Sequence, residues 1–239
     1  MTPWEPVTGN SDQDESAAAG PAAAPRWPWQ RLVSTGNLEY DRLLFFSDAI
    51  FAIAITLLVV DIRVPAGAVD ALQQLQRARP QMIGFAISFA VIGTFWVGHH
   101  TMFRHIRAFN RPLIWLNLLF LGTIAFLPYP TSLLSATTGS APAVVFYAAW
   151  CSVAGVTEAA IWIYACQVPG LVTADTSRAV RWYYALRMLR APLVFLLSIP
   201  VAFAAPTVAP FTWLAIGVLG FLLRRAMPRE DDSRDQETI

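Results

Sequence analysis

The start of the first long apolar segment carries charged and polar residues that could handle an ion or a proton. It reads Arg42-Leu-Leu-Phe-Phe46-Ser47-Asp48, and almost only apolar residues follow as far as Val60. A carboxylate at the centre of a membrane helix costs about 2.5–3.5 kcal/mol, and less near the end of the helix. Asp48 is therefore expected to have a polar partner.

That partner is expected on the same side of the membrane. Arg42 lies on the same segment, and the second apolar segment ends with Trp96 and His99. If the two segments are antiparallel helices, these side chains meet Asp48. We therefore predict a polar network that comprises Arg42, Phe46, Ser47, Asp48, Trp96 and His99. Hydrogen bonding between helices and direct handling of ions or protons are both open interpretations of this network.

Glu158 is the deepest charge in the chain, in the middle of the fourth apolar segment. A hydrogen bond with Thr157, Ser152 or Asn117 is its expected structural role. The alternative is a proton-coupled secondary transporter in which Asp48, His99 and Glu158 act as a relay. Such transporters commonly contain inverted repeats and broken helices around a midplane site. The sequence shows neither, and this favours a channel over a transporter.

The composition places these residues in a membrane protein. Of the 239 residues, 56% are hydrophobic and only 14% are charged, whereas soluble domains have about 25% charged residues. The sequence shows no nucleophile, no metal-ligand spacing and no cofactor motif. We therefore expect no enzyme activity, no bound cofactor or metal other than a permeating ion, and no nucleic-acid partner.

Six apolar segments predict an all-α, polytopic membrane protein with six transmembrane helices. Each is close to the roughly 20 residues that a helix needs to cross a bilayer. If both termini are cytoplasmic, all 17 basic residues except Arg63, Arg77 and Arg79 face the cytoplasm, as the positive-inside rule requires. We expect a multi-pass protein of the plasma membrane in contact with lipids. The segments are 44–62, 82–103, 112–134, 142–166, 190–205 and 208–224.

Three regions follow from this pattern. Residues 1–37 are rich in Pro, Ala and acidic residues, a composition that predicts a disordered cytoplasmic tail. Residues 38–225 form the transmembrane domain, and residues 226–239 form a second charged cytoplasmic tail. Prolines at 192, 200 and 206 interrupt the fifth segment, so a short, kinked hairpin of the fifth and sixth helices is one expectation.

The first segment resembles the signature of a known family. Arg42-x-x-x-Phe46-Ser47-Asp48, followed by Ala-Ile-Phe-Ala-Ile-Ala-Ile-Thr-Leu-Leu, is similar to the motif of the transmembrane-protein-175 family, the potassium channels of endolysosomes and prokaryotes. Trp96-x-x-His99, Asn117-Leu and Phe126-Leu127-Pro128 also resemble that family's pattern. The resemblance covers residues 42–134.

The resemblance implies a potassium-permeable channel without a carbonyl selectivity filter. The sequence agrees, because it contains no Thr-Val-Gly-Tyr-Gly-like loop. In the family the first helix of each six-helix repeat lines the pore. Because this chain has one copy of the motif, the resemblance implies a single-repeat prokaryotic type and a pore formed by homotetramerisation.

The pore-lining residues follow from helical spacing together with the resemblance. Steps of three and four residues from Ala49 reach Ile53, Thr56, Leu57 and Val60. Spacing alone also fits a lipid-facing or packed stripe. The resemblance assigns Ile53 to a hydrophobic constriction and Thr56 to a ring of hydroxyl groups for selectivity, with Leu57 and Val60 lining the pore.

Overall fold

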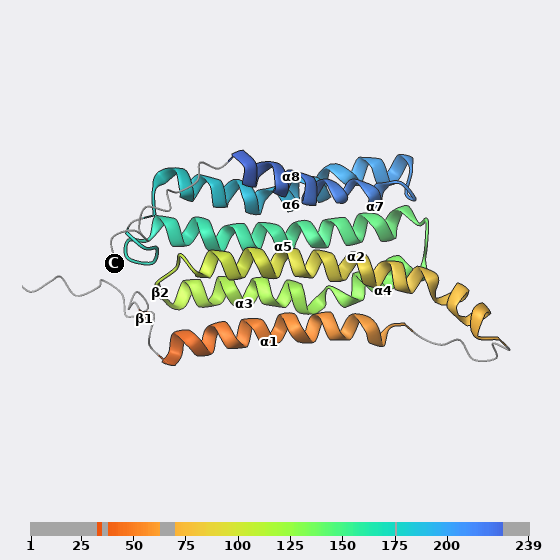
Figure 1. Ribbon diagram of the computed structural model, residues 1–239, viewed down its shortest axis with the longest axis horizontal. Helices are drawn as coiled ribbons and strands as arrows, with labels where there is room; N and C mark the ends of the chain where they lie inside the picture. Colours follow the sequence, from red (N-terminus) through yellow and green to blue (C-terminus); the bar gives the residue numbers. More distant parts are fainter. Residues whose placement is uncertain (1–32, 35–37, 63–69, 175, 227–239) are drawn as a thin grey trace, which may run out of the picture.

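Long helices that lie side by side form almost all of the described structure (Figure 1). The computed structural model describes residues 33–34, 38–62, 70–174 and 176–226. The helices are α1 (Leu38–Val60), α2 (Ala71–Phe103), α3 (Arg111–Phe126), α4 (Pro128–Ala136), α5 (Ala141–Gln167), α6 (Arg178–Ala204), α7 (Ala209–Thr212) and α8 (Leu214–Ala226). Strands β1 (Val33–Ser34) and β2 (Ala108–Phe109) pair antiparallel at the end of the bundle where α1 begins.

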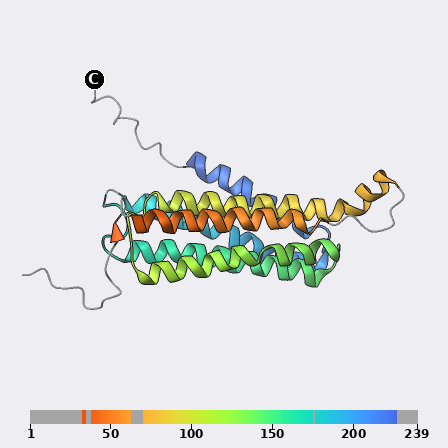
Figure 2. The same cartoon turned by 90° about the horizontal axis from the view of Figure 1, so that it is seen from below.

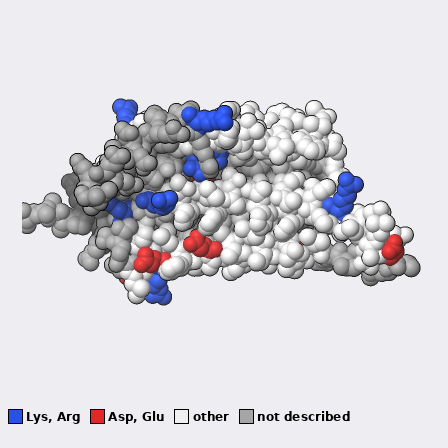
Figure 3. Space-filling model, viewed as in Figure 1, with Lys and Arg blue, Asp and Glu red and all other residues white. Residues whose placement is uncertain are grey.

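The lengths and compositions of these helices confirm the predicted all-α membrane fold. Five spans are long and apolar enough to cross a bilayer: α1, α2, α3 together with α4, α5, and α6. The sixth apolar span, Ala209–Leu223 in α7 and α8, is shorter. Most charged residues on the face shown in Figure 3 lie toward the end where α1 begins, and much of the other half is uncharged.

The third span is broken where the sequence contains two prolines. α3 ends at Phe126, and α4 begins with Pro128 after Leu127. Proline has no N–H group to continue the helical hydrogen bonds, but it suits the first turn of a new helix. The two helices together cover the predicted segment 112–134.

The predicted start of the short fifth segment, 190–205, was wrong. α6 is a 27-residue helix from Arg178 to Ala204 that contains Pro192 and Pro200. Ser177 caps its start by accepting a hydrogen bond from the N–H of Val180, and neighbouring helices in a membrane protein tolerate internal prolines. As a result, Arg187 lies within this helix rather than before the fifth span, and Arg190 lies near the middle of the helix rather than at its start.

The second helix is also longer than predicted. α2 begins at Ala71, so Arg77 and Arg79 lie on a helix rather than in a loop between the first two spans. In Figure 1 this first part of α2 extends beyond the other helices. The predicted tails fall almost entirely outside the described residues.

α5 lies at the centre of the bundle and packs against both α3 and α6. Its buried side chains include Tyr147 and Trp162, which are among the largest fully buried side chains of the chain. α8 contacts α6 and α7, but it leans away from the rest of the bundle (Figure 2). The bundle is therefore closely packed around α5 and less closely packed along α8.

Candidate functional site

One face of α1 packs on the bundle, and the opposite face is open. The packed face consists of Tyr40, Ser47, Phe51, Ala54 and Leu58, which recur at helical spacing and are all buried. Tyr40 also anchors the start of the helix, because its hydroxyl donates a hydrogen bond to the carbonyl of Phe103 at 3.0 Å. These contacts fix the rotation of α1 and decide which residues face outward.

The predicted pore-lining residues all lie on the open face of α1. Ile53, Leu57 and Val60 are 54%, 44% and 69% exposed, and Thr56 is exposed as well. The Thr56 hydroxyl donates to the carbonyl of Ile53 at 2.9 Å, which leaves lone pairs of its oxygen available to accept from a ligand. No described segment of the same chain covers this apolar stripe.

A buried chain of hydrogen bonds joins α1, α2 and α3 behind that face. Asn117 donates from Nδ2 to Ser47 Oγ at 3.0 Å, and Ser47 donates to the carbonyl of Leu43 at 2.9 Å. Asn117 Oδ1 lies 2.9 Å from His99 Nε2. Because Asn117 Oδ1 can only accept, His99 Nε2 must carry the proton in this arrangement.

Aromatic rings hold His99 in place. Its ring lies 4.4 Å from the ring of Phe103 and stacks on Phe120 at 5.6 Å, measured between ring centroids. Phe51 of α1 lies 5.7 Å away. With His99 only 2% exposed, this surrounding is typical of a side chain that fixes helices together.

Asp48 belongs to a separate, exposed pair. Its Oδ1 accepts a hydrogen bond from Trp96 Nε1 at 2.9 Å, and the Trp96 ring stacks on His100 at 5.4 Å. Arg42 and Phe46 lie on the exposed side of α1. The structure therefore divides the predicted network into a buried group and an exposed pair, with Arg42 and Phe46 on the open face.

Sequence reasoning missed the central residue of the buried group. Asn117 connects Ser47 to His99, whereas the sequence pointed to it only as a partner of Glu158 and as part of the Asn117-Leu motif. A single amide in an otherwise apolar segment was the available signal, because such a group must find hydrogen-bond partners inside the membrane.

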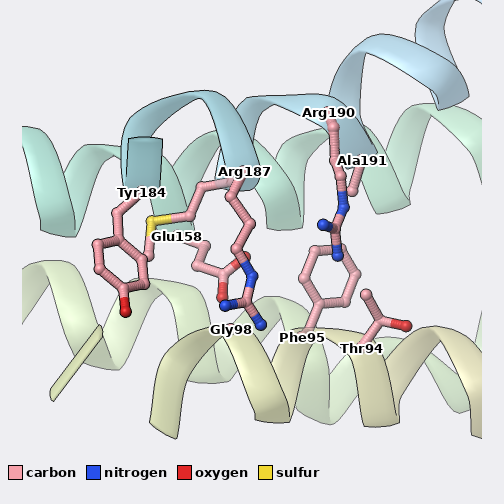
Figure 4. A pocket seen from close by; sticks show the side chains of 9 residues that line it. Thr94, Phe95, Gly98, Glu158, Tyr184, Arg187, Arg190 and Ala191 are labelled. Atoms are coloured by element: carbon pink, nitrogen blue, oxygen red, sulfur yellow. The ribbon is translucent and has the colours of Figure 1, made fainter. Parts of the chain in front are cut away.

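Glu158 lies against a different face of α2 from His99 and has different neighbours from those predicted. Ser152 and Thr157 donate to carbonyls of the backbone, and Asn117 is occupied by Ser47 and His99. Figure 4 shows Glu158 beside Gly98 of α2 and Arg187 of α6. A side chain on Gly98 would collide with the Glu158 carboxylate, so this glycine is what admits the acid between the helices.

Arginines of α6 provide the charge that faces Glu158. Glu158 is 3% exposed, and its carboxylate interacts electrostatically with Arg190 and Arg187. One of its oxygens, Oε1, accepts no hydrogen bond within the described part of the chain. Among the same residues, no group of three or more His, Cys, Asp or Glu side chains is arranged to bind a metal.

Comparisons with known proteins agree with the motif in α1. The family described as "Endosomal/lysosomal potassium channel TMEM175" matches residues 42–128. A potassium channel of Streptomyces collinus is 36% identical over 191 residues, which are 76% of this chain and 89% of that protein. The human endosomal/lysosomal proton channel TMEM175 is 34% identical over 103 residues, 38% of this chain and 20% of that protein.

A solved structure shares the fold. The crystal structure of a lysosomal potassium-selective channel TMEM175 homologue from Chamaesiphon minutus has a TM-score of 0.62 and 28% identity. The match covers 79% of this chain and 96% of that chain. The relatives are named as channels, and none of these names describes an enzyme.

Proposed function

The chain belongs to the TMEM175 family, and we propose that it is a potassium-permeable channel of the plasma membrane. The observation that carries the proposal is the open face of α1, where an apolar stripe continues over Ile53, Leu57 and Val60 without cover from the described part of the chain. A transmembrane helix with one packed face and one open face is suited to line a pore between chains.

The pore is built from α1 of four chains. One α1 cannot enclose a pore, and each chain contributes one such helix, so rotational symmetry is required. The buried hydrogen bonds of Ser47, Asn117 and His99 hold each α1 on its own bundle. In this arrangement the open stripe is directed toward the symmetry axis.

Ile53 forms the constriction and Thr56 the polar ring beyond it. Four branched apolar side chains at one level close a narrow pore sterically and by loss of water. The Thr56 hydroxyls donate to their own helices, so their oxygens are free to replace part of the hydration shell of a cation. Such a pore needs no filter of backbone carbonyls.

In this proposal both termini are cytoplasmic. Arg104, Arg107 and Arg111 surround the short connection between α2 and α3, at the end of the bundle where α1 also begins. Under the positive-inside rule this end is cytoplasmic.

Recording from the purified protein in a voltage-clamped bilayer tests the proposal. With potassium on one side and sodium on the other, we expect a current that reverses at a voltage favouring potassium. A reversal voltage near zero in this gradient would show that the pore does not select potassium, and absence of current from well-assembled protein would contradict a channel.

Proton transport is the second candidate, and the buried acid Glu158 is the observation that favours it. In the described part of the chain, however, no hydrogen bond joins Asp48, His99 and Glu158 into a relay. We therefore expect potassium flux at fixed voltage to continue when a pH gradient across the liposome membrane is abolished. Loss of that flux would favour a proton-coupled transporter.

A further inference from the structure

A groove runs along the side of the bundle where α8 leans away. Its volume is about 630 Å³. Figure 2 shows α8 diverging from the neighbouring helices, and α2 supplies half of the residues that line the groove, with α6 and α8 supplying most of the rest. Small and apolar side chains make up most of the lining, among them Phe89, Gly93, Gly217, Gly220 and Phe221.

Two arginines within this apolar groove give it a positive charge. Arg187 and Arg190 both line it, and Figure 4 shows their side chains extending from α6 toward α2. At the edge of the groove, the Arg225 guanidinium lies 4.4 Å from the ring centroid of Phe221. Glu158 is the acid that faces the two α6 arginines, and Asp48 accepts a hydrogen bond from Trp96 of the lining. Three basic groups therefore lie in or beside the groove against two acidic ones.

Arg190 lies about one turn before the polar end of the short helix α8. Gly220 approaches Arg190 so closely that an added side-chain carbon would lie 2.6 Å from its Nη1. Beyond Gly220, α8 continues with Phe221, Leu222 and Leu223 before two basic residues follow. The apolar part of α8 therefore ends about one turn beyond Arg190, which puts the Arg190 side chain within reach of the region where the hydrocarbon meets the lipid headgroups.

We propose that the groove binds one anionic phospholipid of the cytoplasmic leaflet. The lipid phosphate lies against the guanidinium groups of Arg187 and Arg190, and an acyl chain covers Gly93 and Gly217. Arginine is suited to this contact because its planar group donates two parallel hydrogen bonds to a phosphate.

Charge complementarity selects a lipid over a second copy of the chain. A helix of another copy that filled the groove would bring mostly apolar side chains to this depth. Asp48 is the acid that a second copy could bring to the arginines from its membrane-spanning part, but Asp48 already accepts a hydrogen bond from Trp96. An anionic lipid supplies both the negative charge and the apolar chain that the groove requires. The proposal holds whether or not α1 lines a pore.

Native mass spectrometry of the full chain in detergent tests the proposal, with phosphatidylglycerol and phosphatidylcholine added at equal concentrations. We expect one phosphatidylglycerol per chain to bind more tightly than phosphatidylcholine. Arg187→Gln is expected to weaken that binding about fivefold. Arg104→Gln is the matched control, because Arg104 is exposed and lies outside the groove.

A second variant fills the groove and leaves its charges in place, so it remains informative if Arg187→Gln fails to fold. Gly217 lines the groove, and a side-chain carbon built there meets no atom within 4 Å. Gly217→Leu is therefore expected to fold and to bind at least fivefold less phosphatidylglycerol. Gly122→Leu is the control, since Gly122 on α3 has the same open surroundings and lies away from the groove.

Four results would overturn the proposal. Equal binding of phosphatidylcholine would show that charge does not select the occupant. Displacement of the lipid by inorganic phosphate at equal concentration would identify a free-anion site. Unchanged lipid binding in Gly217→Leu with loss of the oligomer would assign the groove to a second chain. Stronger lipid binding after replacement of Asp231 and Asp232 by Asn would assign it to the acidic C-terminal segment.

Discussion

Ile53 is the single residue on which the proposed constriction depends most directly. It is 54% exposed on the open face of α1, where its truncation leaves the packing of the bundle unchanged. We predict that Ile53→Ala raises potassium flux into liposomes several-fold, because a ring of methyl groups is wider and retains water more readily than a ring of isoleucines.

Val59→Ala is the matched control for that measurement. Val59 is 53% exposed but lies outside the stripe that steps from Ala49 to Val60. Its truncation is expected to leave flux unchanged. Equal flux in the wild type and in Ile53→Ala would remove Ile53 from the pore.

We expect Asn117 to matter for stability rather than for permeation. Its replacement by Ala removes the partner of both Ser47 and His99, and leaving such buried groups unpaired costs about 1–3 kcal/mol. We predict that Asn117→Ala lowers the thermal unfolding temperature of the detergent-solubilised protein while the reversal voltage of the remaining channels is unchanged.

Thr123→Val provides the comparison on the same helix. The Thr123 hydroxyl donates to the carbonyl of Phe120 within α3, so its loss leaves no side chain of another helix without a partner. Equal thermal stability of Asn117→Ala and Thr123→Val would contradict a structural role for the buried chain of hydrogen bonds.

These polar residues show how far the sequence determines the site. The rule that an intramembrane acid needs a partner led to Trp96, which bonds Asp48. The same rule led to wrong partners for Glu158, because charge and depth do not define which helices are neighbours. The apolar pattern put Arg187 before the fifth segment and Arg190 at its first residue, both on the cytoplasmic side, so the acid had no visible counter-charge in the sequence.

At the scale of the helices, the contact between α5 and α6 depends on one glycine. A side-chain carbon on Gly155 would lie 2.5 Å from Cδ of Pro192, and its next two neighbours belong to the same rigid ring. We predict that Gly155→Ala separates the two helices and destabilises the fold by about 1–3 kcal/mol, measured as a lower unfolding temperature.

Gly122→Ala tests whether the effect is due to the contact rather than to the loss of a glycine. Gly122 is exposed, and no atom lies within 4 Å of an added carbon. There the gain in helix propensity, about 1 kcal/mol at most, is expected to leave stability unchanged or improved. A destabilised Gly122→Ala together with a stable Gly155→Ala would contradict this account of the packing.

The helix limits explain why the apolar pattern predicted the number of spans better than their ends. Hydropathy reports which residues lie in hydrocarbon, and for 142–166 this nearly coincides with α5. α2 and α6 each begin about three turns before the predicted apolar segment, and these added turns carry Arg residues. Helical hydrogen bonding can continue beyond the apolar part of a span. Because the added turns are polar, their composition resembles that of loops, and the sequence pattern did not predict them as helix.

At the scale of the whole molecule, the open face of α1 and the groove beside α8 require different partners. The stripe on α1 is apolar and continuous over Ile53, Leu57 and Val60, and identical stripes can meet around an axis. The groove combines apolar walls with Arg187 and Arg190, and identical positive surfaces repel one another. One side of the chain is thus suited to assembly and another to lipid.

Assembly of four chains is expected to depend on how firmly α1 is held, and Asp48 tests this dependence. We predict a native mass of about 106 kDa, four times the 26.4 kDa of one chain, and a smaller tetramer fraction for Asp48→Ala. This change removes the acceptor of the Trp96 hydrogen bond, so α1 loses a contact with α2 near the start of the pore.

Asp41→Ala is the control, because Asp41 is also exposed and lies two turns earlier on the same side of α1. Since Asp48 points away from the stripe, surviving Asp48→Ala channels should keep the wild-type reversal voltage. A complete tetramer with altered selectivity would instead place Asp48 in the ion pathway.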